Sequence, residues 1–225
     1  MGFKLPGEKE LSREQLAIIN LPVTKNYVIQ GGPGTGKTVM AVYRAEQIVS
    51  DKKVLILVFN KPLYLFIKSS VSKMNLSNCK VYNYHKWLSD MYLYLHKTKF
   101  YPQKDNNPYW ERIERDFESL GKIYAHIIID EAQDFPIELI RILSKLSENI
   151  TCFIDPNQAV EKGKTQMPEL LRTFCLECPY TLTRNFRNTT EISRFSSRYC
   201  QLGQPPRAYE SGSLPHLIQV SNYDE

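Results

Sequence analysis

A short apolar segment followed by a glycine-rich loop constrains the fold more than any other part of the sequence. Tyr27-Val28-Ile29 leads into the loop Gln30-Gly31-Gly32-Pro33-Gly34-Thr35-Gly36-Lys37-Thr38, and residues 39–49 have the pattern of a helix. The loop matches G-x-x-x-x-G-K-T, which joins a strand to a helix and cradles phosphate groups. Its glycines let backbone N–H groups turn inward without a Cβ in the way, so they form a concave anion site. The sequence therefore predicts a phosphate-binding loop at the carboxyl end of a strand.

The individual loop positions predict a nucleotide together with Mg²⁺ as the ligand. Lys37 supplies a positive charge for the β- and γ-phosphates, and the Thr38 hydroxyl is a ligand for Mg²⁺. The positive N-terminal end of the following helix also faces the phosphates. The residues predicted to bind ATP here are Gly31, Gly32, Pro33, Gly34, Thr35, Gly36, Lys37 and Thr38. The alternative, a merely glycine-rich turn, does not require the strand and the helix that flank the loop.

Length and composition fit one α/β domain with a tail. The chain has 225 residues, of which 42% are hydrophobic and 24% are charged, as in ordinary globular proteins. No apolar run approaches the ~18 residues of a membrane span, and no basic segment followed by an apolar core begins the chain. We therefore expect a cytoplasmic protein without a membrane partner. The net charge of +5 permits nucleic acid as a partner but does not require it.

The cysteines indicate a reducing compartment. There are five of them, at positions 79, 152, 175, 178 and 200, with no regular spacing. Cys175 and Cys178 are spaced like half of a zinc site, but no second pair completes it. We expect reduced, partly buried thiols.

Apolar runs alternate with helical patterns along the rest of the chain. We expect strands at 53–59, 79–83, 124–129, 150–155 and 180–183. We expect helices at 12–19, 63–68, 84–91, 137–146 and from 188 onward, the last with Ile192, Phe195, Tyr199 and Leu202 on one face. Residues 92–121 form a short insertion with one helix near 108–120. This order predicts a parallel sheet with helices on both faces, and ligands at the carboxyl ends of the strands.

Acidic residues follow two of the expected strands. Asp130 is the expected second ligand to Mg²⁺, and Glu131 is then placed to polarise the water that attacks the γ-phosphorus. The alternative is that both carboxylates only cap the next turn. The segment Asp155-Pro156-Asn157-Gln158 is, on its own, ordinary turn chemistry.

Two further features each allow two interpretations. The segment Arg184-Asn185-Phe186-Arg187 could supply an arginine to the γ-phosphate or be a surface arginine pair. Gln15 lies where a capping box with Ser12 places a glutamine, and its amide could instead read the adenine edge.

Taken together, these motifs resemble those of the UvrD/Rep-type superfamily 1 helicases. The match follows order and spacing over residues 11–202 and consists of Gln15, residues 31–38, Phe59-Asn60-Lys61, Tyr84-His85, residues 130–134, residues 155–158 and residues 182–187. The resemblance implies that Gln15 reads adenine, Phe186 stacks on the base, Gln158 senses the γ-phosphate and Arg187 contacts it. It also implies that Lys37, Glu131, Gln158 and Arg187 are the catalytic residues. Asn60, Lys61, Tyr84 and His85 match segments that touch single-stranded DNA.

The sequence departs from that family at two positions and in its extent. Ile154 stands where the family usually has a glycine before the acid of the glutamine motif, here Asp155. Val39 stands where the family often has an arginine, so we expect adenine to be stacked on one side only or by other residues. The resemblance implies a P-loop ATPase domain of RecA-like fold at 1–202 and a connector at 203–225. The connector leads toward an absent second RecA-like domain, supplied in cis or by a partner subunit.

We therefore expect a helicase or translocase motor domain that uses ATP and Mg²⁺ and binds single-stranded DNA in preference to RNA. Alone it is expected to be weakly active, because the second domain holds Arg187 in place. The alternatives are a regulatory or defence-type ATPase switch that does not unwind nucleic acid, and a non-catalytic nucleic-acid-binding fragment.

Overall fold

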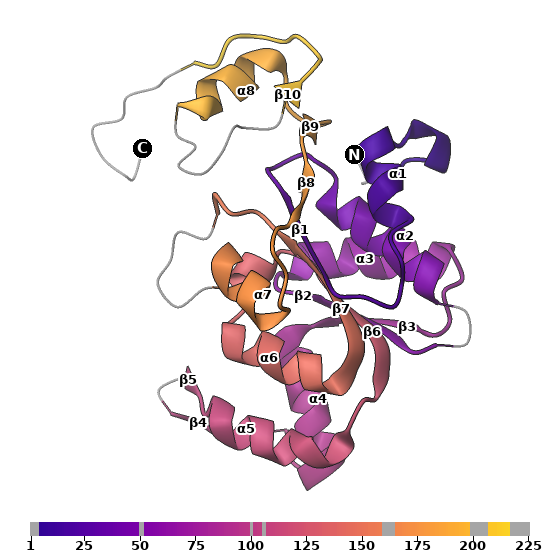
Figure 1. Ribbon diagram of the computed structural model, residues 1–225, viewed down its shortest axis with the longest axis vertical. Helices are drawn as coiled ribbons and strands as arrows, with labels where there is room; N and C mark the ends of the chain where they lie inside the picture. The colour runs from indigo at the N-terminus through magenta and orange to yellow at the C-terminus, as the bar shows by residue number, and fades with distance from the viewer. Residues whose placement is uncertain are drawn as a thin grey trace.

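The computed structural model describes residues 5–49, 52–99, 101–104, 107–158, 165–198 and 207–216, arranged around a six-stranded parallel sheet (Figure 1). The strands are β1 (Tyr27–Gly31), β2 (Val54–Val58), β3 (Cys79–Asn83), β6 (Tyr124–Ile129), β7 (Ser147–Ile154) and β8 (Tyr180–Leu182). Their order across the sheet is β3-β2-β6-β7-β1-β8, and every neighbouring pair is parallel. The predicted α/β class with a parallel sheet is confirmed.

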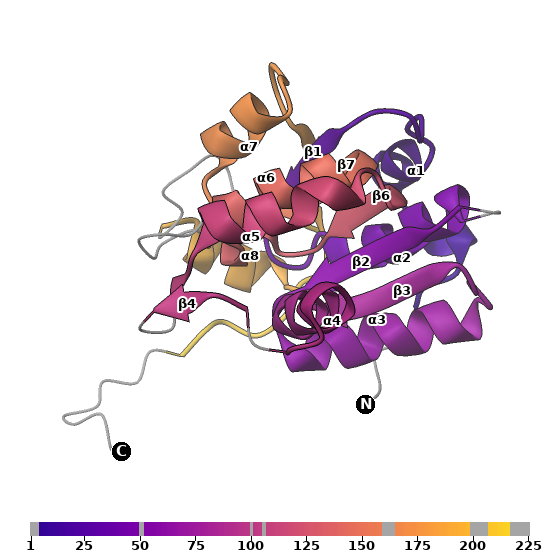
Figure 2. The ribbon, with the colours of Figure 1, turned by 90° about the horizontal axis from the view of Figure 1, so that it is seen from below.

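The inner strands β1, β2, β6 and β7 are largely buried on both faces, which explains why they read as mainly apolar runs, whereas the edge strands β3 and β8 are partly exposed. Successive side chains alternate between two cores, so Val28 belongs to one and Ile29 to the other. The helices α1 (Arg13–Ile19), α2 (Lys37–Ile48) and α3 (Lys61–Lys73) supply the core of one face. The helices α4 (Tyr84–His96), α5 (Trp110–Phe117), α6 (Ile137–Leu146) and α7 (Met167–Thr173) supply the other. Figure 2 shows α3 on one side of the sheet and α5, α6 and α7 on the other.

The parallel arrangement places the ends of distant segments side by side. Because β1 lies between β7 and β8, the phosphate loop after β1 is flanked by the segments that follow those strands. Asp130 and Asp155 directly follow β6 and β7, which are neighbours in the sheet. The polar residues singled out from the sequence therefore gather at one edge of the sheet.

The smaller elements differ most from the expectations. The helices α3 and α4 extend beyond the predicted 63–68 and 84–91, and α7 was not predicted. The insertion contains β4 (Gln103–Lys104) paired antiparallel with β5 (Asn107–Pro108), and α5. After β8, β9 (Arg184–Asn185) pairs with β10 (Arg207–Ala208) beside α8 (Thr190–Ser197). The remaining elements are the short 3-10 helices η1 (Glu8–Glu10), η2 (Glu118–Leu120) and η3 (Ala132–Asp134).

Three residues with predicted roles are not among the described residues. Tyr199, Cys200 and Leu202, predicted on the last helix or as a thiol, lie outside the described residues. Cys79 and Cys152 are buried, Cys175 and Cys178 are exposed, and all four are free thiols.

No cluster of three or more His, Cys, Asp or Glu side chains suited to a metal occurs in the described part of the chain. Among the described helices, none is long and apolar enough to cross a membrane.

Candidate nucleotide-binding site

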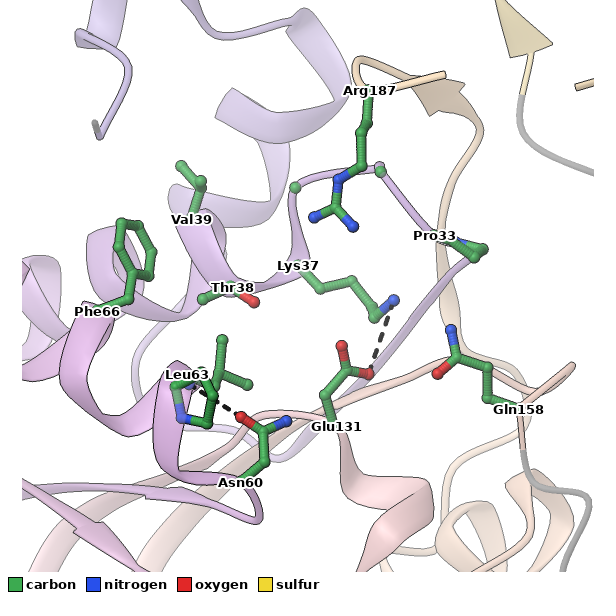
Figure 3. A pocket seen from close by; sticks show the side chains of 13 residues that line it. Pro33, Lys37, Thr38, Val39, Asn60, Leu63, Phe66, Glu131, Gln158 and Arg187 are labelled. Carbon is green, nitrogen blue, oxygen red and sulfur yellow. Dashed lines mark hydrogen bonds and ion pairs between the residues drawn. The ribbon is translucent and has the colours of Figure 1, made fainter. Parts of the chain in front are cut away.

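A pocket of about 340 Å³ lies at the carboxyl edge of the sheet (Figure 3). Its walls come from the phosphate loop and the start of α2, from Asn60 and the first turns of α3, and from the segments after β6, β7 and β8. The lining residues are Pro33, Gly34, Gly36, Lys37, Thr38, Val39, Asn60, Pro62, Leu63, Phe66, Glu131, Gln158 and Arg187. All four residues predicted to be catalytic therefore face one cavity.

The glycines of the loop are required by conformation and by close packing. Gly34 and Gly36 have φ angles of 79° and 88°, in the left-handed region that favours glycine. A Cβ on Gly36 would lie 2.6 Å from Nε2 of Gln15, and one on Gly34 would overlap the Asn185 side chain. The glycines thus let two other segments of the chain approach the loop.

The Lys37 ammonium lies among oxygens from three neighbouring strand ends. Its Nζ donates to the carbonyl of Gly31 at 2.9 Å and to that of Gly32 at 3.4 Å. It also lies 3.9 Å from Oε2 of Glu131 and 3.9 Å from Oδ2 of Asp155. The side chain is 5% exposed, so this positive charge is held at the pocket wall with little contact to solvent.

Asp130 has the features of a ligand for a hard cation. It is fully buried, and burial together with the neighbouring Glu131 carboxylate raises the pKa of Asp130 to about 7. The Thr38 hydroxyl and the Lys37 ammonium partly oppose this shift. Oδ2 of Asp130 has no hydrogen-bond partner among the described residues. An orphaned carboxylate oxygen beside a threonine hydroxyl fits Mg²⁺, which takes one or two carboxylates together with phosphate oxygens.

Glu131 is held in an uncommon backbone conformation at the pocket. Its φ of 54° is in the left-handed region, which costs of order 1 kcal/mol or more for a residue other than glycine. Gln133 supports it, because Nε2 of Gln133 donates to Oε2 of Glu131 at 2.9 Å. Oε1 of Gln133 accepts from the backbone N–H of Asp155 at 3.0 Å. This buried amide therefore joins the ends of β6 and β7, a role that the sequence motif contained but did not reveal.

The turn after β7 carries Gln158 to the pocket. Oδ1 of Asp155 accepts from the backbone N–H of Asn157 at 3.1 Å, and Oδ2 accepts from Nε2 of Gln158 at 2.9 Å. The ordinary turn chemistry expected from the sequence is present. The same turn places the Gln158 side chain opposite Lys37 in Figure 3.

The segment after β8 is anchored on the phosphate loop. The backbone N–H of Phe186 donates to the carbonyl of Gly34 at 2.8 Å. Oδ1 of Asn185 accepts from the backbone N–H groups of Arg187 and Asn188 at 2.8 and 2.9 Å. The Arg187 side chain then points into the pocket toward Lys37 (Figure 3). The backbone around Arg187 is thus held by this chain, and the expectation that a second domain holds the Arg187 side chain in place stays a prediction.

Gln15 and Phe186, the two residues expected to contact adenine, do not line this pocket. The predicted capping box is present, because Oε1 of Gln15 accepts from the backbone N–H of Ser12 at 2.9 Å. Nε2 of Gln15 donates to the carbonyl of Thr35 at 3.1 Å. The Phe186 ring is 45% exposed and lies 4.9 Å from the Arg184 guanidinium. Their contacts with a base stay predictions.

Of the four residues expected to touch single-stranded nucleic acid, Asn60, Lys61 and His85 are exposed and Tyr84 is buried. Asn60 caps α3, with Oδ1 accepting from the backbone N–H of Leu63 at 2.9 Å, and it lines the pocket. Tyr84 is 7% exposed, and its ring packs 5.4 Å from that of Phe135. Its ring therefore offers no open face for a base.

Comparison with known proteins gives a family match and several similar structures. A protein-family model described as Schlafen group 3, DNA/RNA helicase domain, matches residues 24–217, a span that contains every predicted site residue except Gln15. No match was found among the curated proteins.

Similar solved structures include three helicases. The Hef helicase domain of Pyrococcus furiosus is 17% identical with a TM-score of 0.47, covering 77% of this chain and 38% of that one. The Pif1 helicase from Candida albicans is 14% identical with a TM-score of 0.49, covering 79% and 40%. The arterivirus nonstructural protein 10 helicase, in complex with DNA, is 16% identical with a TM-score of 0.46, covering 93% and 47%. This chain spans less than half the length of each.

The raised pKa of Asp130 predicts a pH-dependent stability. The folded protein keeps a proton on Asp130 between pH 3.8 and about 7, whereas the unfolded chain has released it. The stability contributed by this proton is present below that range and is lost as the pH rises through it. We therefore expect Asp130→Asn to be more stable than the wild type at pH 8, with a smaller difference at pH 5, in urea denaturation. Glu111→Gln, at an exposed position of α5, is the control. If the gain in the free energy of unfolding of Asp130→Asn over the wild type is the same at pH 5 and pH 8, this account of Asp130 is wrong.

Proposed function

The chain belongs to the family of Schlafen group 3 DNA/RNA helicase domains, and from this premise we propose that it binds and hydrolyses ATP with Mg²⁺ as one motor domain of a nucleic-acid-dependent ATPase. The observation that carries the proposal is the convergence of Lys37, Glu131, Gln158 and Arg187 on one pocket, beside Thr38 and Asp130. An arrangement with two cations, an amide and a carboxylate around a phosphate loop suits phosphoryl transfer to water.

The phosphates would be bound by the loop and by the positively charged side chains. The first residues of α2 line the pocket, so the N-terminal end of the helix would offer backbone N–H groups to the phosphates, and Lys37 approaches with its charge nearly desolvated. Asp130 and the Thr38 hydroxyl would hold Mg²⁺, which when bound neutralises charge between the β- and γ-phosphates.

Hydrolysis would use Glu131 as the base that orients and deprotonates water. Its carboxylate is fixed by the Gln133 amide and lies 3.9 Å from the Lys37 ammonium. Arg187 enters from the side of the pocket opposite Glu131, and Gln158 lies beside Glu131 near the Lys37 ammonium (Figure 3); both would contact the γ-phosphate. Charge that spreads over the γ-phosphate oxygens would then meet two cations in preset positions.

The domain arrangement extends the proposal. Residues 1–202 would form the first RecA-like domain, with 92–121 as its insertion, and residues 203–225 would lead toward a second such domain. Single-stranded DNA is the proposed partner, in preference to RNA, with Lys61 and His85 as exposed contacts. Duplex unwinding would require the second domain, since translocation needs two domains that close on ATP.

A regulatory ATPase switch that does not unwind nucleic acid is the second candidate. The burial of Tyr84 favours it, because a ring packed against the core is not open for stacking on a base. Stimulation of ATP turnover by single-stranded DNA separates the two candidates, since only the motor requires it.

Glu131→Gln tests the assignment of the base. The amide keeps the size of the side chain but cannot accept the proton, so ATP should still bind while turnover falls by roughly 10²–10⁴. Binding is measured by calorimetry and turnover by phosphate release. The matched control is Glu138→Gln, an exposed position on α6. Wild-type turnover in Glu131→Gln would place the base elsewhere.

Asn185→Ala tests how Arg187 is positioned. Without the Asn185 carbonyl oxygen, the N–H groups of Arg187 and Asn188 lose their acceptor, so the turn that aims Arg187 should loosen. The preference for ATP over ADP should fall about tenfold while ADP affinity stays unchanged, since only the γ-phosphate contact is lost. Arg187→Ala should have the same effect, and the double variant should add little to it. Equal losses of ATP and ADP affinity would show that Asn185 only supports the loop.

A further inference from the structure

The pocket has a charged end and an apolar end. Lys37, Glu131, Gln158 and Arg187 surround the charged end, and Val39, Leu63 and Phe66 lie together at the other (Figure 3). Thr38 lies between the two groups. The apolar residues have no role in phosphate binding, and the function proposed above leaves them unexplained.

The apolar wall follows from where α3 begins. The Asn60 side chain caps the helix and Pro62 occupies its first turn. Leu63 and Phe66 are three residues apart and so lie on the same face of the helix. They and Val39, from the first turn of α2, are partly buried against the core beneath α1, α2 and α3. Leu65 points away from this face and is 55% exposed. The helix thus presents an apolar surface to the pocket.

A nucleoside triphosphate, like the pocket, has a charged end and a less polar end. If its γ-phosphate lies beside Lys37 and Arg187, its chain of phosphates runs past Thr38 toward Val39. The base is the apolar end of the molecule and would then reach the wall formed by Leu63 and Phe66. Stacking and apolar contact with one aromatic ring contribute roughly 1–3 kcal/mol per base in nucleic-acid complexes.

We propose, on the basis of the proposed function, that Val39, Leu63 and Phe66 form the nucleobase subsite and hold the base by apolar contact. None of the three carries a donor or acceptor on its side chain, so the subsite does not select adenine. The nearby Asn60 has its Oδ1 occupied by the Leu63 N–H, and its Nδ2 can donate equally to an acceptor of adenine or of guanine. The substrate class is therefore nucleoside triphosphates in general. The replacement of the usual arginine by Val39 is part of this same wall.

The test measures the binding of three probes to the full chain by calorimetry in the presence of Mg²⁺: ATP, GTP and inorganic tripolyphosphate. In the wild type, ATP and GTP should bind with affinities within about threefold of each other. Phe66→Ala should weaken both about tenfold and leave tripolyphosphate affinity unchanged, which also shows that the variant is folded. Leu65→Ala, one position away on the same helix, should change none of the three, and Phe66→Tyr should restore nucleotide affinity.

Leu63→Ala tests a second residue of the same apolar wall. It should also lower the affinity for ATP and GTP without changing the affinity for tripolyphosphate. The subsite is wrong if Phe66→Ala binds ATP as Leu65→Ala does. It is also wrong if the wild type prefers ATP over GTP more than tenfold and Gln15→Ala abolishes that preference, because Gln15 would then read the base. In both cases wild-type ATP binding remains. If the wild type binds neither ATP nor tripolyphosphate, the proposed function fails, and the subsite fails with it.

Discussion

The Lys37 ammonium, held among oxygens from three adjacent strand ends, is the interaction on which the site depends. Two of those oxygens are carbonyls of the loop after β1, and the others are carboxylates that follow β6 and β7. They meet only because β6, β7 and β1 are neighbours in a parallel sheet. Buried positive charge requires such partners, and a phosphate in the pocket would be a further one. The sheet order therefore assembles the site.

Much of this arrangement was predictable from local patterns in the sequence. Strands buried on both faces read as apolar runs, so the inner strands β1, β2 and β6 were located to within about a residue, and the edge strands β3 and β8 were located as closely. The strand β7 begins three residues before its predicted start at 150. The phosphate loop is recognisable from the spacing of its glycines, lysine and threonine. Parallel strands then require that polar residues after them share one edge, which is why Glu131, Gln158 and Arg187 meet Lys37 as expected. The helicase class is confirmed by the family match, whereas the UvrD/Rep type is not.

Features that depend on side-chain direction and long-range packing were not predictable. Tyr84 belongs to a matched motif, yet its ring packs against Phe135, because Tyr84 lies on the side of α4 that faces the core. The segment that carries Arg187 is anchored by the Phe186 N–H, which donates to the carbonyl of Gly34, more than a hundred residues away in the chain. Gln133 joins two strand ends that only the sheet brings together. Hydrophobic periodicity and motif spacing describe residues that are near each other in the sequence, so they cannot reveal contacts between distant segments or the direction of a side chain.

Mg·ATP binding to Lys37→Ala, measured by calorimetry, tests the central claim most directly. Losing one charge-assisted contact to the phosphates costs roughly 1.5–3 kcal/mol, which corresponds to about a ten- to hundredfold loss of affinity. Lys61→Ala, an exposed lysine at the start of α3, controls for the loss of one positive charge and should bind as the wild type does. Wild-type affinity in Lys37→Ala would contradict the account, because the loop would then not be the phosphate site.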